Sequence, residues 1–142
     1  MARIKIDLPD NYHFSTELPI RITDLNYGGH VGNDRILGLL HEVRVQYLQS
    51  IGLSELNFAG TSLIMGDVAI EFKREIHYGD QLLASIKVTG FTRAGFELYY
   101  KLELIKGGKH LLAVAAKTGM VCFDYSTSKI TSLPVSFRNL FE

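Results

Sequence analysis

The spacing of apolar residues predicts one long helix in the first half of the chain. Over residues 33–51, apolar side chains recur at intervals of three and four positions, at Ile36, Leu40, Val43, Tyr47 and Ile51. This spacing is typical of one face of a helix. Asn33 or Asp34 is a suitable N-cap, and Gly52 is a suitable C-cap. Leu37 widens the apolar side, so we expect the helix to be covered over much of its circumference.

Beyond the helix, the spacing changes to an alternation of apolar and polar positions, which is typical of strands with one buried face. The alternating segments are residues 68–72, 82–88 and 96–104. Residues 111–123 are nearly all apolar, which predicts an interior strand covered on both faces. Residues 4–8 and 18–22 alternate over shorter stretches and are two further candidate strands.

Turn sequences separate these predicted strands. Glycine-containing joints lie at residues 78–80, 92–95 and 107–108, and such short joints imply antiparallel neighbours. The chain shows no linker, charge block or internal repeat, so we expect a single domain over residues 1–142. The order of strand, long helix and four strands predicts an α+β fold with one helix lying on an antiparallel sheet.

Charge and cysteine content narrow the possible partners. Fifteen Lys and Arg residues balance fifteen Asp and Glu residues, so the global charge favours neither nucleic acid nor an acidic membrane surface. The lone Cys122 and the scattered histidines give no disulfide and no zinc-binding spacing, so we expect no metal. Without a signal sequence or an apolar stretch of about 20 residues, the chain is expected to be cytoplasmic and not to contact a membrane.

The densest polar segment, residues 21–34, lies just before and at the start of the predicted helix. It holds an acid, an amide and an imidazole at Asp24, Asn26 and His30. Its three glycines allow a ligand to approach the backbone, and the free N–H groups of a helix start can hold an oxyanion. The alternative is a turn with an N-cap, in which Asp24 and Asn26 only bind neighbouring backbone.

The sequence Asp-Leu-Asn-Tyr-Gly-Gly-His-Val-Gly-Asn at residues 24–33 resembles the signature loop of hotdog-fold thioesterases of the 4-hydroxybenzoyl-CoA thioesterase type, Asp-x-Asp-x-x-Gly-His-Val-x-Asn. The similarity continues in register through residues 42–44, 78–80 and 133–134, and so spans nearly the whole chain. It implies a hotdog fold, in which a curved antiparallel sheet of about five or six strands wraps a long central helix. This arrangement agrees with the apolar pattern.

One departure from the family pattern concerns the chemistry, because Asn26 stands where the family has its usual catalytic carboxylate. An amide cannot serve as a base. The remaining candidates are His30 as base with Asn26 as orienting group, or a carboxylate from Asp24 or Glu42. Asp24 has a structural alternative, in which it binds the loop backbone or compensates a buried Arg44.

Helical spacing separates two charged residues of the predicted helix. Arg44 falls within the apolar side, where a guanidinium needs compensation, so we expect it to be buried in a structural ion pair. Glu42 falls on the opposite side and is by default a solvated residue. The resemblance keeps it as a candidate, since in hotdog dimers that side of the helix can approach the site.

The resemblance also implies substrate contacts in the same loop. These fall on Tyr27, Gly28, Gly29 and Asn33. Lys73 and Arg93 are candidates for contacts with the phosphates of coenzyme A, although each is by default a solvated surface charge.

The function implied by the resemblance is hydrolysis of the thioester bond of an acyl-CoA or an acyl-carrier protein to a free acid and a thiol. Water is the second substrate, and coenzyme A enters only as part of the substrate, so no cofactor is expected. The alternative is a non-catalytic acyl-thioester-binding protein that lost hydrolysis through Asn26. Because one small sheet leaves its edges open, we expect a homodimer or a dimer-based homotetramer with the site between chains.

Overall fold

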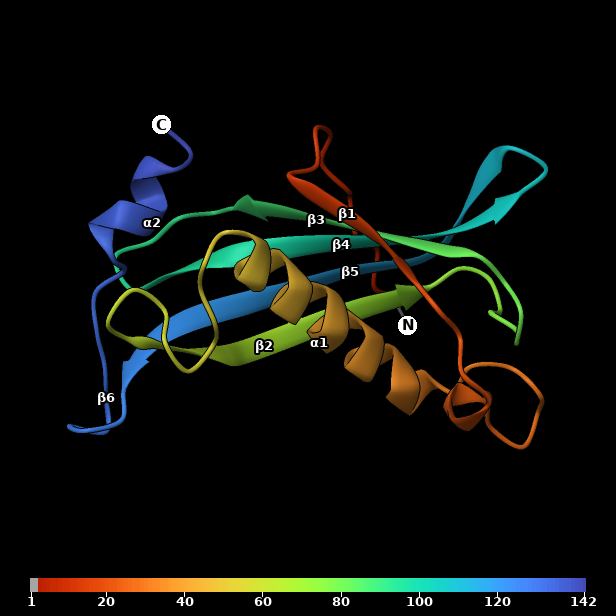
Figure 1. Cartoon of the computed structure of the whole chain (residues 1–142), viewed down its shortest axis with the longest axis horizontal. Helices are drawn as coiled ribbons and strands as arrows, with labels where there is room; N and C mark the ends of the chain where they lie inside the picture. Colours follow the sequence, from red (N-terminus) through yellow and green to blue (C-terminus); the bar gives the residue numbers. More distant parts are fainter. Residues whose placement is uncertain (1–2) are drawn as a thin grey trace.

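One long helix lies against one face of a curved antiparallel sheet in the computed structural model, which describes residues 3–142 (Figure 1). The elements in chain order are β1 (Phe14–Leu18), the 3-10 helix η1 (Ile22–Asp24), α1 (Asn33–Ser50), β2 (Ser62–Phe72), β3 (Leu82–Thr89), β4 (Gly95–Lys106), β5 (Lys109–Asp124), β6 (Lys129–Ile130) and α2 (Val135–Asn139).

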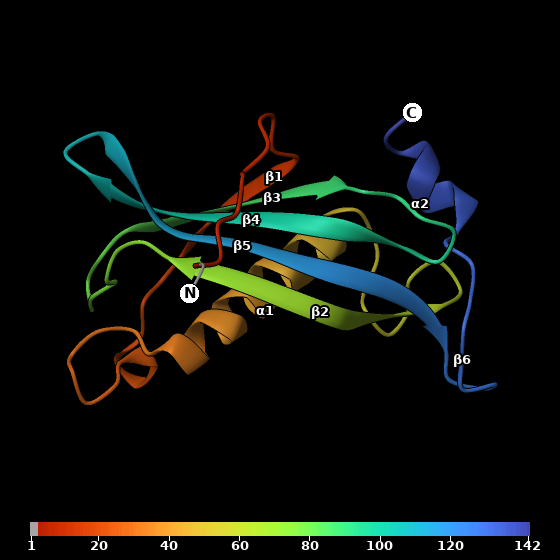
Figure 2. The same ribbon diagram turned by 180° about the vertical axis from the view of Figure 1, so that it is seen from behind.

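The six strands form a single sheet in the order β1-β3-β4-β5-β2, and the short β6 pairs with β5. All pairings are antiparallel. Helix α1 crosses one face, while the N-terminal segment crosses the opposite face (Figure 2). This is the hotdog fold expected from the sequence. Among the described residues, neither helix is long and apolar enough to cross a membrane.

The helix and the four strands that follow it are confirmed. The helix runs from Asn33 to Ser50, although Gly32 is its N-cap and provides no side-chain cap. Strand β5 lies between β4 and β2, as its apolar sequence predicts. Strand β2 begins at Ser62 rather than at residue 68.

The predictions of two short strands near the N-terminus, at residues 4–8 and 18–22, are wrong. Strand β1 ends at Leu18, and the predicted strand over residues 18–22 is absent because Pro19 has no N–H to continue the pairing. Residues 4–8 form no strand, and the backbone N–H of Ile6 donates instead to the Glu71 side chain at 3.1 Å.

The C-terminal helix α2 and the strand β6 were not predicted. Phe137 of α2 is buried, and its ring centroid lies 4.7 Å from that of Phe58 and 4.8 Å from that of Phe96. Helix α2 therefore closes one end of the core with an aromatic cluster. Its five residues are too few to show a helical pattern in the sequence.

Helix α1 is buried on one side only. Its inner face packs into the core with Ile36, Leu39, Leu40, Val43, Tyr47 and Leu48. On the outer side, Leu37 and Val45 are each 42% exposed. The expectation of a helix covered over much of its circumference is thus not met within one chain.

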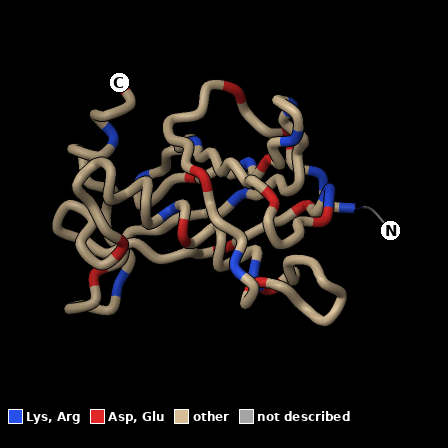
Figure 3. The backbone as a smooth tube through the Cα atoms, turned by 45° about the vertical axis from the view of Figure 1, so that its right-hand side comes forward, with Lys and Arg blue, Asp and Glu red and all other residues tan. Residues whose placement is uncertain are grey.

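Charged residues of both signs are interspersed over residues 3–142 (Figure 3). On the sheet face opposite α1, for example, Lys117 Nζ lies 2.7 Å from Glu97 Oε2. The neutral balance of the sequence thus also holds locally.

Arg44 is the buried, ion-paired residue that helical spacing predicts. Only 6% of it is exposed, its Nε donates to Glu55 Oε1 at 2.8 Å, and its Nη1 donates to the Tyr100 hydroxyl at 3.1 Å. Its carboxylate partner is therefore Glu55, in the segment after the helix, and not Asp24. Burial alone would lower the pKa of Arg44, but Tyr100 and Glu55 outweigh it and the pKa is raised.

The Arg44–Glu55 pair should stabilise the fold measurably. Breaking a fully buried ion pair costs about 3–5 kcal/mol. Because 26% of the Glu55 side chain is exposed, we expect Arg44→Met to lower the free energy of unfolding in urea by about 2–3 kcal/mol. Adding Glu55→Gln, which removes the unpaired charge, should recover part of that loss. A loss below about 1 kcal/mol would mean that water and His41, whose Nε2 lies 3.3 Å from Glu55 Oε1, compensate Glu55 fully.

Candidate active site

The loop between η1 and α1 is shaped by Asn26. Its backbone N–H donates to the carbonyl of His30 at 2.8 Å, and its own carbonyl accepts the N–H of Gly29 at 3.1 Å. Its side-chain Oδ1 accepts the N–H of Gly28 at 2.9 Å. Gly29 has φ +80°, a conformation that favours glycine. The amides of Gly28 and Gly29 are thus both used inside the loop, so neither is free to bind a substrate carbonyl.

Free backbone N–H groups occur directly after the loop, at the start of α1. The N–H groups of Arg35 and Ile36 both donate to the carbonyl of Gly32. For the amides of Asn33 and Asp34, no acceptor lies among residues 3–142. The first amides of a helix point along its axis and attract negative charge. This pair of amides is the part of the predicted loop able to stabilise an oxyanion.

His30 faces two oxygen acceptors. Its Nδ1 lies 3.2 Å from the carbonyl oxygen of Val31, and its Nε2 lies 3.4 Å from Glu75 Oε2. The side chain is 29% exposed. Because a neutral imidazole has a single N–H, it can donate to only one of these two oxygens.

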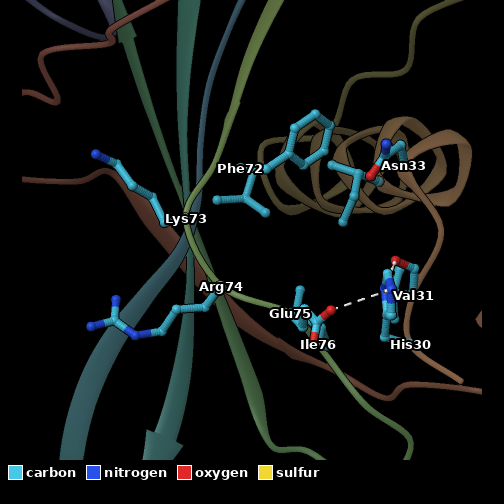
Figure 4. A pocket seen from close by; sticks show the side chains of 10 residues that line it. His30, Val31, Asn33, Phe72, Lys73, Arg74, Glu75 and Ile76 are labelled. Atoms are coloured by element: carbon cyan, nitrogen blue, oxygen red, sulfur yellow. Dashed lines mark hydrogen bonds and ion pairs between the residues drawn. The ribbon is translucent and has the colours of Figure 1, made fainter. Parts of the chain in front are cut away.

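The imidazole opens into a small cavity, the loop cavity, of about 210 Å³ (Figure 4). Its lining residues are His30, Val31, Asn33, Ile36, Phe72, Lys73, Arg74, Glu75, Ile76 and Val114. Ligand pockets typically measure about 300–1,000 Å³. The loop cavity can therefore hold a reacting group and its immediate surroundings, but not a whole acyl-CoA.

Lys73 reaches this cavity, as a phosphate contact would require, but its side chain points away from His30 (Figure 4). Its Nζ lies 2.9 Å from Glu71 Oε2. The neighbouring Arg74 also points away and donates to the carbonyl of Leu112 at 2.7 Å. Both cations therefore line the mouth of the cavity and already have partners.

Glu75 is the lining residue that sequence reasoning missed. It follows β2 in a segment that is held to the loop by a backbone bond, in which the N–H of Val31 donates to the carbonyl of Ile76 at 2.7 Å. The neighbouring turn is closed by Asp80, whose Oδ2 accepts the N–H of His77 at 2.7 Å. No local sequence signal marks Glu75, because its position depends on this contact between distant segments.

Asp24 lies outside the loop cavity and binds backbone. Only 3% of it is exposed, and its Oδ2 accepts the N–H of Arg21 at 2.9 Å. Its carbonyl accepts the N–H of Gly32 at 3.2 Å. The structural alternative for Asp24 is thus the one that the observed contacts favour.

Glu42 shares a separate groove with Asp24, the outer groove, between β1 and the exposed side of α1. This groove measures about 320 Å³ and is lined by Leu18, Pro19, Arg21, Asp24, Arg35, Gly38, Leu39, Glu42 and Gln46. Glu42 Oε2 accepts the amide of Gln46 at 2.8 Å. Glu42 is exposed, as helical spacing predicts, and the structure does not bring it to His30 within one chain.

Two predicted substrate contacts also lie apart from the cavity. Tyr27 projects fully into solvent from the loop. Arg93 lies in the turn between β3 and β4, beside α2 and at the opposite end of the sheet (Figure 1), where its carbonyl accepts the N–H of Leu133 at 2.8 Å. Strand β3 carries the chain along the sheet, so Arg93 and the loop do not meet within one chain.

The donor set gives no metal centre. Over the part of the chain that the structure describes, no group of three or more His, Cys, Asp or Glu side chains is arranged to hold a metal ion. The roles of the acid, amide and imidazole groups around the loop are therefore argued from proton transfer and hydrogen bonding.

Comparisons with known proteins assign the family. The model of the thioesterase-like superfamily matches residues 20–141, and the chain belongs to this superfamily. Among curated proteins, none matched the chain.

Several solved structures are similar over most of their length. A 1,4-dihydroxy-2-naphthoyl-CoA thioesterase from Synechocystis is 25% identical, with a TM-score of 0.79 over 89% of this chain and 93% of its own. The 4-hydroxybenzoyl-CoA thioesterase from Pseudomonas sp. strain CBS-3 is 17% identical, with a TM-score of 0.80 over 92% and 99%. A thioesterase from Thermus thermophilus, complexed with coenzyme A and zinc, is 19% identical, with a TM-score of 0.77 over 91% and 97%. The Pseudomonas and Thermus proteins are only 17% and 19% identical to this chain, so their similarity supports the fold alone.

The contacts of Asp24 generate a stability test. Asp24→Ala leaves the partly buried N–H of Arg21 without its acceptor and should lower the free energy of unfolding by about 1–2 kcal/mol. Asp24→Asn keeps an oxygen at the same place and should restore most of the stability. Urea unfolding measures both variants. If Asp24→Ala is as stable as the wild type, the carboxylate has no structural role.

Proposed function

We propose that this chain hydrolyses the thioester bond of an acyl-CoA or of an acyl-carrier protein, giving a free acid and a thiol. The observation that carries the proposal is the pair of unpartnered amides of Asn33 and Asp34 at the start of α1, where Asn33 lines the same cavity as the His30 imidazole, in a chain of the thioesterase-like superfamily. The reaction needs water and no organic or metal cofactor. Coenzyme A takes part only as the leaving thiol of the substrate.

The amides of Asn33 and Asp34 act on the carbonyl oxygen of the thioester. When water attacks the carbonyl carbon, negative charge develops on that oxygen, and preorganised N–H donors stabilise it most in the transition state. The helix dipole adds to the effect, since the amides belong to the first turn of an 18-residue helix.

Asn26 has a limited role in this scheme. Its Oδ1 is bound to the N–H of Gly28, so only its NH₂ group is available to a ligand. It can therefore donate a hydrogen bond to an oxygen of the substrate or of water, but it cannot take a proton. His30 lines the loop cavity, where proton transfer can depend on it directly or through a neighbouring group, whereas Asp24 and Glu42 line the outer groove.

The assembly that we propose is a homodimer, or a tetramer built from it, formed through β2. This strand is the outer edge of the sheet and is 11 residues long. Its side chains Met65, Val68 and Phe72 are 41%, 38% and 44% exposed. A long apolar edge strand is a template for pairing with another chain.

A dimer of this kind also explains the distant Arg93. Antiparallel pairing of two β2 edges brings the α2 end of one chain towards the loop end of the other. A phosphate contact from Arg93 is then made to substrate bound at the neighbouring chain, which the separation within one chain does not allow. The exposed Leu37 and Met65, which line a cleft of about 280 Å³ between α1 and β2, become covered.

The first test is thioester turnover. Wild-type protein should release thiol from at least one member of a panel of aliphatic and aromatic acyl-CoA thioesters, read with a thiol reagent. His30→Ala should lower kcat about a hundred-fold, because proton transfer typically contributes about 10²–10⁴. Asn26→Ala should lower kcat about ten- to a thousand-fold through loss of a positioned hydrogen bond. His110→Ala, on the β4–β5 hairpin, is the matched control.

The same panel separates hydrolysis from mere binding. A wild type that binds acyl-CoA without turnover, while Asn26→Asp gains hydrolysis, would contradict the proposed enzyme and support the binding protein. Hydrolysis that is unaffected by changes at Asp24, Asn26 and His30 would exclude the loop as the active site and leave Glu42 as the next carboxylate to test.

The second test concerns the dimer. Sedimentation at micromolar concentration should give a species of twice the 15.9 kDa of one chain, or a multiple of that dimer. Val68→Lys places a charge on the β2 edge and should shift the protein towards monomer. His110→Lys, an exposed position beside the β4–β5 turn, is the control and should leave the assembly unchanged. A wild-type monomer would exclude a site shared between chains.

A further inference from the structure

The loop cavity contains a carboxylate, although none of the carboxylates of the loop faces it. Asn26 replaces the aspartate of the family pattern, and the other loop carboxylate, Asp24, binds the backbone of Arg21. Glu75 nevertheless lines the cavity, with its Oε2 at 3.4 Å from His30 Nε2 (Figure 4). A carboxylate therefore reaches the imidazole from the opposite wall.

The backbone fixes this carboxylate in register with the imidazole. His30 and His77 form an isolated antiparallel bridge, supported by the N–H of Val31 donating to the carbonyl of Ile76 at 2.7 Å. Glu75 lies two residues before His77 in the chain. Its second oxygen, Oε1, lies 3.8 Å from His77 Nε2, which is beyond hydrogen-bond distance. That oxygen remains open to solvent, since the side chain is 64% exposed.

His30 is poorly arranged to accept a proton itself. Its Nδ1 faces the carbonyl oxygen of Val31, and its Nε2 faces Glu75. Both neighbours are acceptors, and the single N–H of a neutral imidazole can donate to Glu75 when it is on Nε2. The remaining lone pair, on Nδ1, then faces the carbonyl oxygen of Val31. The geometry suits an imidazole that holds the carboxylate in place.

We infer that Glu75 is the catalytic base of this chain and that His30 is its positioning residue. The inference rests on the proposed thioester hydrolysis, whose missing carboxylate it supplies. Of the residues that line the loop cavity, Glu75 is the only carboxylate.

The step balances with water as the only co-reactant. The water oxygen attacks the thioester carbonyl carbon, the carbonyl electron pair moves to the oxygen held by the Asn33 and Asp34 amides, and Glu75 takes one water proton. The intermediate then reforms its C=O bond, and the C–S bond breaks with its electron pair on sulfur. Glu75 returns the proton to that sulfur. The products are a carboxylic acid and a thiol, and Glu75 is again a carboxylate.

The test measures thiol release by the dimeric wild type and by Glu75→Gln, using the acyl-CoA that the wild type hydrolyses fastest. Glu75→Gln should lower kcat at least about a hundred-fold, with KM changed less than about threefold. Glu75→Asp keeps a carboxylate and should stay well above Glu75→Gln. The control is Glu97→Gln, a carboxamide substitution on the sheet face opposite α1, which should leave kcat unchanged. Thermal unfolding confirms that each variant is folded.

Two readouts separate a base from a merely structural carboxylate. Added formate should restore part of the activity of Glu75→Ala, because it can occupy the vacated space and accept the proton. The acidic limb of the kcat–pH profile should be lost in Glu75→Gln. His30→Gln keeps a donor towards Glu75, so it should lower kcat less than His30→Ala and retain the acidic limb.

The possible failures are distinguishable. If the wild type hydrolyses a thioester and Glu75→Gln hydrolyses it equally fast, the role of Glu75 is overturned while the proposed function stands. The same conclusion follows if Glu75→Gln is slow but keeps the acidic limb, and formate does not rescue Glu75→Ala. If the wild type hydrolyses no thioester, the proposed function fails, and the inference fails with it.

Discussion

The packing of α1 against the concave face of the sheet is the constraint on which the other features depend. Val43, at the middle of the helix, is completely buried. Because the helix is fixed there, its two ends are held in place relative to the segments that they contact. At its C-terminal half, Arg44 reaches Glu55 and Tyr100 and ties the helix both to the next segment and to β4. At its start, the same packing places Asn33 in the lining of the loop cavity and leaves the amides of Asn33 and Asp34 without a backbone acceptor.

Because α1 is packed only on its inner face, apolar side chains remain exposed on its outer side. Leu37 on the helix and Met65 on the β2 edge line one cleft, and both are partly exposed in a single chain. Burial of apolar surface and completion of the β2 hydrogen bonds favour the same association. The proposed dimer also accounts for the small size of the loop cavity and for the distance to Arg93, because a second chain could then supply further substrate contacts.

The sequence predicts what depends on local periodicity and misses what depends on non-local register. The apolar spacing of α1 and the alternation in β3 and β4 are local, so the helix, those strands and the burial of Arg44 follow from it. The partner of Arg44 is Glu55, which lies in an irregular segment without a pattern of its own. Glu75 meets His30 only because the segment after β2 pairs with the loop, and no spacing within either segment records that pairing. The family motif located the loop, but not which of its amides are free.

The replacement of a loop carboxylate by Asn26 has a physical consequence for the oxyanion donors. A second carboxylate beside the first turn of α1, in addition to that of Asp34, would also be attracted to the free amides of Asn33 and Asp34 and would compete there with a thioester oxygen. A neutral amide that binds Gly28 keeps the loop in shape without that competition. Placing the negative charge on Glu75, across the cavity, separates the proton acceptor from the oxyanion donors. In the proposed mechanism, the water proton therefore goes to Glu75 and the negative charge of the carbonyl oxygen goes to the amides, so the two do not compete for one group.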